Sequence, residues 1–275
     1  MNNLLIHSMA EFAPSIILPC LETAGVSEIT EIGAEFGGMS FLLAEYCAQA
    51  GGKLTSIDPT PKPEFLDWVA AHPEVAHIDK PSLEALKPLP AADAWIVDGD
   101  HNYYTVFNEL SAIDAICQRD GKPLLAFLHD VSWPCARRDF YYAPDRIPAE
   151  HRHPYSYDVG VHPDHGEAML NRGWRGMGQF ALALHEGGPR NGVLTAVEDF
   201  VAEADREDRP LVFAQVPAVF GLGVVLDAGA DWAEELAGIL RPWHRNELLA
   251  TLELNRLRNH LAVIEWQDRE AERAA

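Results

Sequence analysis

The sequence predicts an α/β fold in which a mostly parallel β-sheet carries helices on both faces. Short continuous runs of apolar residues alternate with segments of helical spacing along the first half of the chain. Strands that are covered on both faces read as such continuous runs, and parallel sheets are covered in this way. With 275 residues, of which 48% are apolar, the chain is long enough to bury one sizeable core.

The predicted elements follow one another in a regular order as far as residue 129. A first helix covers residues 9–24 and ends at Gly25. Five predicted strands follow at residues 28–33, 53–58, 75–78, 94–98 and 123–129, and the helices between them lie at 39–49, 64–71 and 104–119.

An insertion of about residues 131–192 follows the fifth strand. It is rich in Pro, Gly, Arg, His and aromatic residues, and only residues 167–171 predict a short helix within it. A loop of this length is expected in a compact domain only where it has a function. One helix and two further strands complete a predicted sheet of seven strands, at residues 193–204, 211–216 and 221–226.

The last part of the chain predicts a helical extension at residues 231–275, interrupted at Pro242, after a main domain of residues 1–230. Apolar residues recur in the extension at alternating steps of four and three positions, which is typical of a packing seam. This seam would cover either the protein's own domain or the same helix of a second copy in a homo-oligomer. Its members are Ala250, Leu254, Leu257, Leu261 and Ile264.

The composition argues against two classes of partner and favours one compartment. A formal net charge of −21 disfavours nucleic acids and anionic membranes, since both need a basic surface. No run approaches the roughly 20 apolar residues of a membrane span, and the N-terminus lacks the pattern of a secretion signal. The four cysteines have no metal-type spacing and are expected to be buried free thiols, which suits a reducing compartment. We therefore expect a cytoplasmic protein.

A glycine-rich turn follows the first strand, where Gly33 and the pair Gly37-Gly38 lead into a helix. Such a turn lets the backbone approach a nucleotide-like ligand closely. The spacing differs from the G-x-G-x-x-G of dinucleotide folds, and the Gly-Lys-Ser/Thr of a P-loop is absent from the sequence. Asp58 ends the next strand, where a carboxylate can accept hydrogen bonds from both hydroxyls of a ribose.

Two motifs, E-I-G-x-x-x-G-G-x-S at residues 31–40 and S-I-D-P at 56–59, resemble the cofactor motifs of class I S-adenosylmethionine (SAM)-dependent methyltransferases. That family has a Rossmann-like fold. Two later motifs are V-D-G-D-H-N-Y at 97–103 and L-H-D-V at 128–131. They are similar to the subgroup that includes macrocin-type sugar O-methyltransferases and cephalosporin-hydroxylase-like proteins.

The resemblance covers residues 25–131 well and residues 193–226 loosely, and it implies a role for each motif. Glu31 and the backbone of the glycine turn would hold the methionine end of SAM, Asp58 its ribose, and the segment around Ser82 would lie near its adenine. The cofactor-binding residues implied are Glu31, Gly33, Ala34, Gly37, Gly38, Ser40, Asp58, Ser82, Leu83 and Asp98.

Polar residues follow two strands that are expected to be neighbours. Asp98, Asp100 and His101 follow one strand, and His129 and Asp130 follow the other. The carboxyl ends of parallel strands lie on one rim of the sheet, close to a bound nucleotide. Carboxylates and imidazoles grouped there can coordinate Mg²⁺ or Mn²⁺. The alternative is that the aspartates only cap helices and form turns, and Asp100 is expected to have such a supporting role.

The rim also resembles, more distantly, that of the catechol-type metal-dependent methyltransferases. This resemblance implies Asp98, His129 and Asp130 as metal ligands and His101 as the general base. The chain departs from the pattern by having histidine at both His101 and His129. Imidazole titrates near neutrality and suits a base, whereas His129 could instead orient Asp130 or contact SAM.

The insertion begins directly after Asp130, so we expect it to lie over the rim. Its aromatic and basic residues would form a lid over a flat or sugar-like acceptor, or alternatively an oligomer contact. Its histidine pairs, at 151 and 153 and at 162 and 165, are expected to be ordinary exposed side chains rather than a zinc site.

The sequence as a whole predicts a Mg²⁺-assisted O-methyltransferase that binds SAM and methylates a small polar acceptor, such as a natural product or a sugar. A metal would lower the pKa of the acceptor hydroxyl and a base would remove its proton. Three alternatives remain. They are a metal-independent methyltransferase for a nitrogen, carboxylate or peptide acceptor, a binding or scaffold protein, and an oxygenase with two histidines and a carboxylate on iron.

Overall fold

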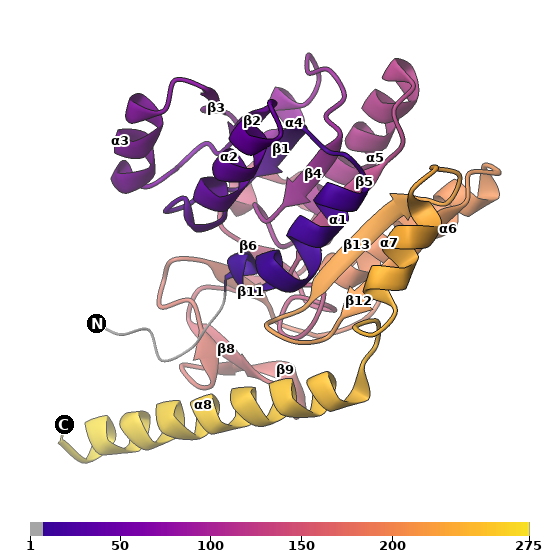
Figure 1. The fold of residues 1–275 in the computed structure, drawn as a ribbon. Coiled ribbons are helices and arrows are strands. Elements are labelled where there is room, and N and C mark those ends of the chain that lie inside the picture. The colour runs from indigo at the N-terminus through magenta and orange to yellow at the C-terminus, as the bar shows by residue number, and fades with distance from the viewer. Residues whose placement is uncertain (1–7, 275) are drawn as a thin grey trace.

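A seven-stranded sheet with the order β12-β13-β5-β4-β1-β2-β3 forms the centre of the structure, a computed structural model that describes residues 8–274 (Figure 1). Neighbouring strands among the first five are parallel, whereas β13 runs antiparallel to both β5 and β12. The predicted Rossmann-like α/β fold is therefore confirmed. The strands are β1 Glu28–Ile32, β2 Lys53–Ile57, β3 Val75–Ile78, β4 Ala94–Val97, β5 Leu125–His129, β12 Leu211–Val216 and β13 Leu222–Asp227.

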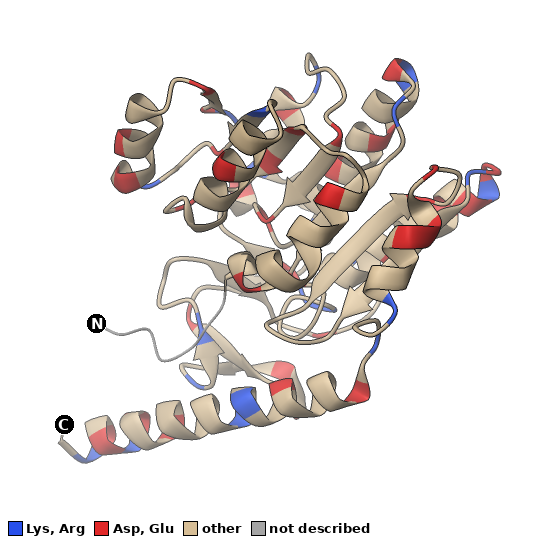
Figure 2. Cartoon of the chain, in the orientation of Figure 1, with Lys and Arg blue, Asp and Glu red and all other residues tan. Residues whose placement is uncertain are grey.

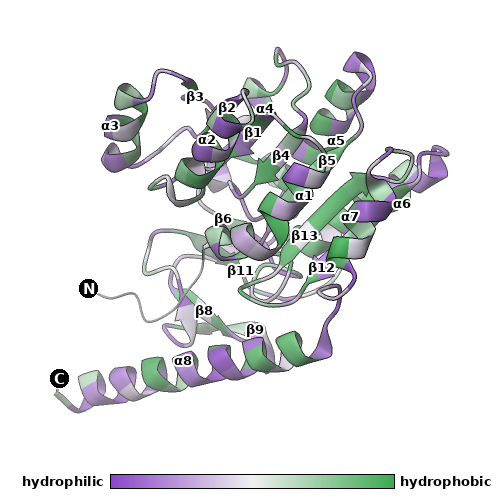
Figure 3. Ribbon diagram, in the orientation of Figure 1, coloured by the Kyte–Doolittle hydropathy of each residue, from purple (hydrophilic) through white to green (hydrophobic). Residues whose placement is uncertain are grey.

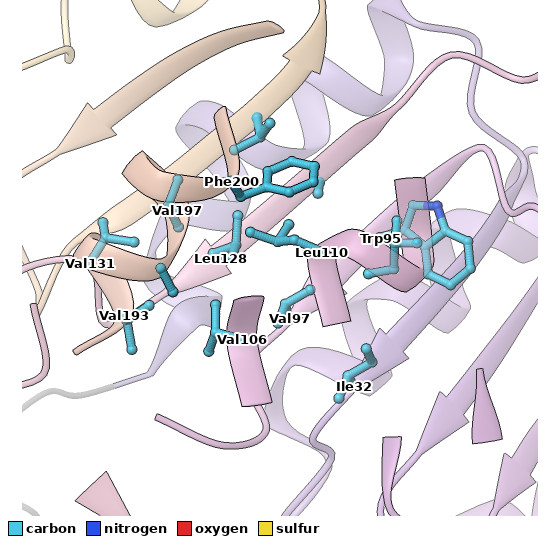
Figure 4. Packing of buried hydrophobic residues seen from close by; sticks show 14 of the residues in the cluster. Ile32, Trp95, Val97, Val106, Leu110, Leu128, Val131, Val193, Val197 and Phe200 are labelled. Atoms are coloured by element: carbon cyan, nitrogen blue, oxygen red, sulfur yellow. The ribbon is translucent and has the colours of Figure 1, made fainter. Parts of the chain in front are cut away.

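Consecutive residues of a strand point to opposite faces of a sheet. Both faces of this sheet are apolar, and helices cover each of them. On one face Trp95 and Leu128 belong to a core with α4, α5 and α6 (Figure 4). On the other face Ile96 and Phe127 belong to a core with α1, α2 and α7. In Figure 3 the strand β13 has the colour of apolar residues and lies between α1 and α7. The helices are α1 Leu18–Thr23, α2 Gly38–Gln49, α3 Pro63–Ala71, α4 Ser82–Ala85, α5 Tyr103–Asp120, α6 Val193–Arg206 and α7 Ala233–Leu240.

The segment expected as one helix over residues 9–24 consists of three helical pieces. A 3₁₀ turn, η1 Met9–Phe12, is followed by a π-helical turn, η2 Ala13–Ile17, and then by α1. Pro14 and Pro19 lie in the second and third pieces and have no backbone N–H to donate, which interrupts regular α-helical bonding.

The insertion forms two small antiparallel sheets rather than an open loop. The short helix predicted at residues 167–171 is wrong, because His165–Leu170 is a strand that pairs with Val159–His162 across a short turn. Backbone pairing in this hairpin outweighs the helical propensity of the Glu-Ala-Met-Leu stretch. The elements are β6 Phe140–Tyr141, η3 Pro144–Arg146, η4 Ala149–His151, β7 Tyr155–Ser156, β8 Val159–His162, β9 His165–Leu170, β10 Trp174–Arg175 and β11 Ala181–Ala183.

A long C-terminal helix, α8 Glu247–Ala274, runs beneath the insertion (Figure 1). The predicted seam faces the protein's own chain at its centre, where Leu257 and Leu261 are buried. Acidic and basic residues are interspersed along α8 (Figure 2), and its Asp268 pairs with Arg175 of the insertion. Because other apolar residues of α8, among them Trp266, are exposed, a homo-oligomer through this helix stays a prediction.

The expected division of the chain at residue 230 also stays a prediction. Leu236 and Leu240 of α7 are buried in the core of the main domain, whereas α8 lies outside that core. All four cysteines are free and buried, as expected. Within residues 8–274, each helix is either too short or too polar to cross a membrane.

Glu109 provides a test of the core. It is fully buried in α5, and burial raises the pKa of its carboxyl from 4.5 to about 8. The pKa of this carboxyl is 4.5 in the unfolded chain and about 8 in the folded one, so folding is favoured most while the carboxyl is neutral in both states. The free energy of unfolding therefore falls as the pH rises from 4.5 to about 8. We therefore expect the melting temperature of the wild type to fall across this range and that of Glu109→Gln to fall less. Thermal melts across pH measure this, with exposed Glu45→Gln as the control; parallel curves for the wild type and Glu109→Gln would contradict it.

Candidate active site

The glycine turn packs directly against the end of β4. Gly33 has a φ of +91°, and a Cβ placed on it would lie 2.2 Å from the carbonyl oxygen of Asp98. Gly37, at the N-cap of α2, also has a positive φ, of +87°. Glycine is thus required at Gly33 both by the backbone conformation and by the close approach of the neighbouring strand.

Glu31 lies beneath this turn and is almost completely buried. Its Oε2 accepts hydrogen bonds from the hydroxyls of Ser40, at 2.6 Å, and Ser56, at 3.0 Å. Its Oε1 has no hydrogen-bond partner within residues 8–274. Burial raises the pKa of Glu31 to about 8. A buried acceptor without a partner fits a site that receives a donor from a ligand such as the ammonium group of SAM.

Asp58 follows β2 and holds the glycine turn in place. Its Oδ2 accepts the backbone N–H groups of Ala34, at 3.0 Å, and Glu35, at 2.9 Å, and its Oδ1 accepts that of Thr60, at 2.8 Å. Sequence reasoning assigned this carboxylate to the ribose alone and missed its bonds to the turn. A carboxylate has about four lone-pair positions, so one remains for a ribose hydroxyl.

The other residues implied in SAM binding lie around the same edge. Ser82 and Leu83 begin α4, just beyond the end of β3, and both are half-buried. Gly38 begins α2, beside the turn. The implied cofactor residues therefore lie at or beyond the carboxyl ends of β1, β2, β3 and β4, where a nucleotide is expected to bind in an open α/β sheet.

Four side chains of the rim form a closed ring. His101 Nε2 lies 3.3 Å from Asp98 Oδ1 and 3.0 Å from Asp130 Oδ2. His129 Nδ1 lies 3.2 Å from the same Asp98 oxygen and 3.7 Å from the same Asp130 oxygen. These spacings are close to those of neighbouring ligand atoms around a metal, about 3.0–3.4 Å for bonds of about 2.1 Å. The arrangement therefore fits a divalent cation.

The other nitrogen of His129 supports this fit. Nε2 lies 3.0 Å from the carbonyl oxygen of Val219, which can only accept, so Nε2 carries the proton. A neutral His129 therefore presents the lone pair of Nδ1 to Asp98. Two acceptors at 3.2 Å repel each other unless a proton or a cation lies between them. Donation of the second ring N–H to a carbonyl is also the usual arrangement of a metal-binding histidine.

The electrostatics of the ring favour positive charge. Burial lowers the pKa of His129, but the carboxylates of Asp98 and Asp130 outweigh it and raise the pKa to about 9. Burial raises the pKa of Asp98, but the two imidazolium groups outweigh it and hold that pKa below its usual range. Without a metal, a proton on His129 thus supplies the charge that a cation would supply.

Asp100 does not belong to the ring. It is turned toward α5, where it accepts a hydrogen bond of 3.1 Å from the hydroxyl of Thr105. Sequence reasoning missed Cys135, a buried residue of the insertion that lies near His101 and Asp130, with donor atoms within 4.8 Å of one another. Its position five residues after Asp130 was the only signal in the sequence.

Buried polar residues anchor the insertion beside the rim. Asp139 accepts hydrogen bonds from the backbone N–H groups of Tyr103 and Gly192, both at 2.7 Å. The backbone N–H of Phe140 donates to the carbonyl of His101 at 2.9 Å, and the ring of Tyr142 lies 5.8 Å from that of His101. The insertion therefore contacts the rim, while its role as a lid stays a prediction.

The two histidine pairs of the insertion make separate local contacts. His151 stacks on Tyr104 with ring centres 4.7 Å apart, and His153 Nε2 lies 2.8 Å from the carbonyl of Arg190. The rings of His162 and His165 lie 5.4 Å apart on the β8–β9 hairpin. Of these four histidines only His165 is exposed, and the other three are half-buried, so the expectation of exposed side chains is wrong for those three.

Comparison with known proteins gives a family match for the part of the chain that holds this site. Residues 30–131 match the model of a methyltransferase domain. A comparison with curated proteins gave no match.

Several solved structures are similar in fold. A SAH-bound methyltransferase of Podospora anserina has 15% sequence identity and a TM-score of 0.43, with 75% of each chain covered. A 1,6-didemethyltoxoflavin-N1-methyltransferase of Burkholderia thailandensis has 12% identity and a TM-score of 0.41, covering 76% of this chain and 75% of the other. A protein of Pyrococcus horikoshii has 10% identity and a TM-score of 0.46, covering 79% and 89%. The residues matched by the methyltransferase-domain model, 30–131, include the glycine turn, Asp58 and the four side chains of the ring.

Proposed function

We propose that the protein is a divalent-metal-assisted O-methyltransferase that acts on a small polar acceptor, such as a natural product or a sugar. The observation that carries this proposal is the ring of Asp98, His101, His129 and Asp130, with its spacings of 3.0–3.7 Å. The likeness of V-D-G-D-H-N-Y and L-H-D-V to macrocin-type sugar O-methyltransferases supports the hydroxyl acceptor.

Each group of residues has a role in this proposal. The glycine turn and Glu31 hold the methionine end of SAM, Asp58 its ribose, and Ser82-Leu83 lies near its adenine. Bound SAM supplies the methyl group, and a bound cation lowers the pKa of the acceptor hydroxyl.

The rim residues then prepare the acceptor. Asp98, His129 and Asp130 hold the cation. A cation at Asp98 and Asp130 would displace the proton that these carboxylates hold on His101, and Nε2 could then take the proton of the acceptor hydroxyl. The insertion excludes water from the sulfonium as a lid.

Removal of metal tests this function. The protein is treated with EDTA, and methyl transfer from SAM is measured with a panel of sugars, catechols, amines and carboxylic acids before and after Mg²⁺ or Mn²⁺ is added. We expect turnover of hydroxyl acceptors to fall by about 10²-fold or more and to return with metal, because a metal supplies several kcal/mol to such a step. Full activity in EDTA would favour the metal-independent enzyme. Absence of SAM binding by calorimetry would favour a scaffold protein.

A further inference from the structure

The turn between β12 and β13 has a backbone conformation that needs an explanation. Val219 has a φ of +47° and Phe220 a φ of +60°, and Gly221 follows with +93°. Left-handed backbone is rare in residues other than glycine, above all in a β-branched residue such as valine, and it persists where surrounding contacts hold it. This turn is also the one that presents the Val219 carbonyl to His129 Nε2, at 3.0 Å.

The contacts that hold the turn come from two sides. From the rim, the backbone N–H of Ser132 donates to the carbonyl of Phe220 at 2.7 Å. From α8, the Oε1 of Glu253 accepts the backbone N–H of Phe220 at 2.9 Å. The turn is therefore fixed between the segment that follows Asp130 and the C-terminal helix.

Glu253 is itself firmly held. It is only 7% exposed, although α8 is mostly open to solvent. Arg256 donates two hydrogen bonds to its carboxylate, from Nε to Oε2 at 2.7 Å and from Nη2 to Oε1 at 2.6 Å. The same guanidinium lies 5.0 Å from the centre of the Phe220 ring. A carboxylate is costly to bury, so its position between Arg256 and the Phe220 N–H calls for a specific role.

We propose that Glu253 is a positioning residue for His129, which makes α8 part of the active-site architecture. Glu253 fixes the Phe220 amide, the strained turn then places the Val219 carbonyl, and that carbonyl holds His129 with Nδ1 directed at Asp98. The inference rests on the proposed function, because Nδ1 is the atom that would bind the cation. The Val219 carbonyl lies directly behind the proposed ligand His129, where such partners tune metal affinity, and Glu253 acts on it through the turn.

Variants of similar size separate this role from a general effect on folding. Glu253→Gln keeps an oxygen that can accept the Phe220 N–H, whereas Glu253→Met has none. Glu253→Asp keeps the charge beside Arg256 but withdraws the carboxylate from Phe220. The control is Glu265→Gln, an exposed glutamate of the same helix that pairs with Arg269 at 3.1 Å.

The measurement is the affinity for Mn²⁺ alone, by electron paramagnetic resonance, beside the affinity for SAM, by calorimetry. We expect Glu253→Met and Glu253→Asp to bind Mn²⁺ about 10-fold more weakly and Glu253→Gln to bind it as the wild type does. SAM affinity should stay within about twofold in all of them, since SAM binds at β1 to β4.

The outcomes are distinct. Wild-type Mn²⁺ affinity in Glu253→Met, or in Glu253→Asp if the methionine variant does not fold, would overturn the role of Glu253 alone. An equal loss in Glu253→Gln, or a parallel loss of SAM affinity, would show a general structural effect and also overturn it. A wild-type protein that binds no Mn²⁺ would overturn the metal part of the proposed function, and this inference with it.

Discussion

Replacement of Asp98 by asparagine is expected to lower methyl transfer by about 10²–10³-fold, which is the size of effect seen when one charge-stabilising group is removed from an active site. Asp98 Oδ1 is shared by His101 and His129, at 3.3 and 3.2 Å. Asparagine keeps the shape of the side chain but removes the negative charge that these two imidazoles and a cation need. Turnover with the best acceptor and Mn²⁺ affinity measure the effect, and exposed Asp164→Asn is the control. Unchanged turnover in Asp98→Asn, together with full activity in EDTA, would refute a metal-assisted mechanism.

The same variant has a pH signature in the metal-free protein. Since the pKa of His129 is raised to about 9, its protonated form stabilises the fold fully below the ordinary value of 6.5, and this contribution is lost as the pH rises through about 9. Of the two carboxylates that raise the pKa of His129 against the effect of burial, Asp98 has the larger effect. Asp98→Asn should therefore lower the melting temperature at pH 6.5 more than above pH 9. A difference from wild type that does not change with pH would contradict the pairing.

The central strands β4 and β5 could be predicted from the sequence because all their residues are buried, whereas the edge strands β3 and β12 are only partly buried. β3 and β12 were predicted at their observed residues, 75–78 and 211–216. The rim was predicted for a related reason. Asp98 and His129 are far apart in the chain, but β4 and β5 are parallel neighbours, so residues that follow them must meet.

The insertion could not be predicted in this way. Its strands are short, and their pairing depends on distant contacts such as those of Asp139 with Tyr103 and Gly192. Residues 167–171 have helical propensity and carry no local sign of the hairpin that they join.

The support of His129 was also beyond sequence reasoning. The Val219 carbonyl is a backbone group and has no signature in the sequence. Glu253 lies in a helix whose charged residues mostly face solvent. Only the folded chain shows that these two residues and His129 belong together.

Replacement of Gly33 by alanine is expected to weaken SAM binding by about 10²-fold or more and to lower the free energy of unfolding by about 3 kcal/mol or more. The new Cβ would lie 2.2 Å from the carbonyl oxygen of Asp98, 2.6 Å from its carbonyl carbon and 2.7 Å from the Cα of Gly99. All three are backbone atoms of the segment that follows β4, so no flexible side chain can move aside. The strand end that carries Asp98 must shift, and both the cofactor turn and the rim are displaced.

Gly238→Ala is the matched control for this substitution. Gly238 is exposed in α7, and a Cβ there would meet no atom within 4 Å. Alanine is favoured over glycine in a helix interior by about 0.5–1 kcal/mol, so this variant should be slightly more stable than the wild type and bind SAM equally well. Urea unfolding and calorimetry with SAM compare the two variants. If Gly33→Ala bound SAM as Gly238→Ala does, the close packing of the turn against β4 would not be needed for cofactor binding, and the role assigned to this turn would have to be abandoned.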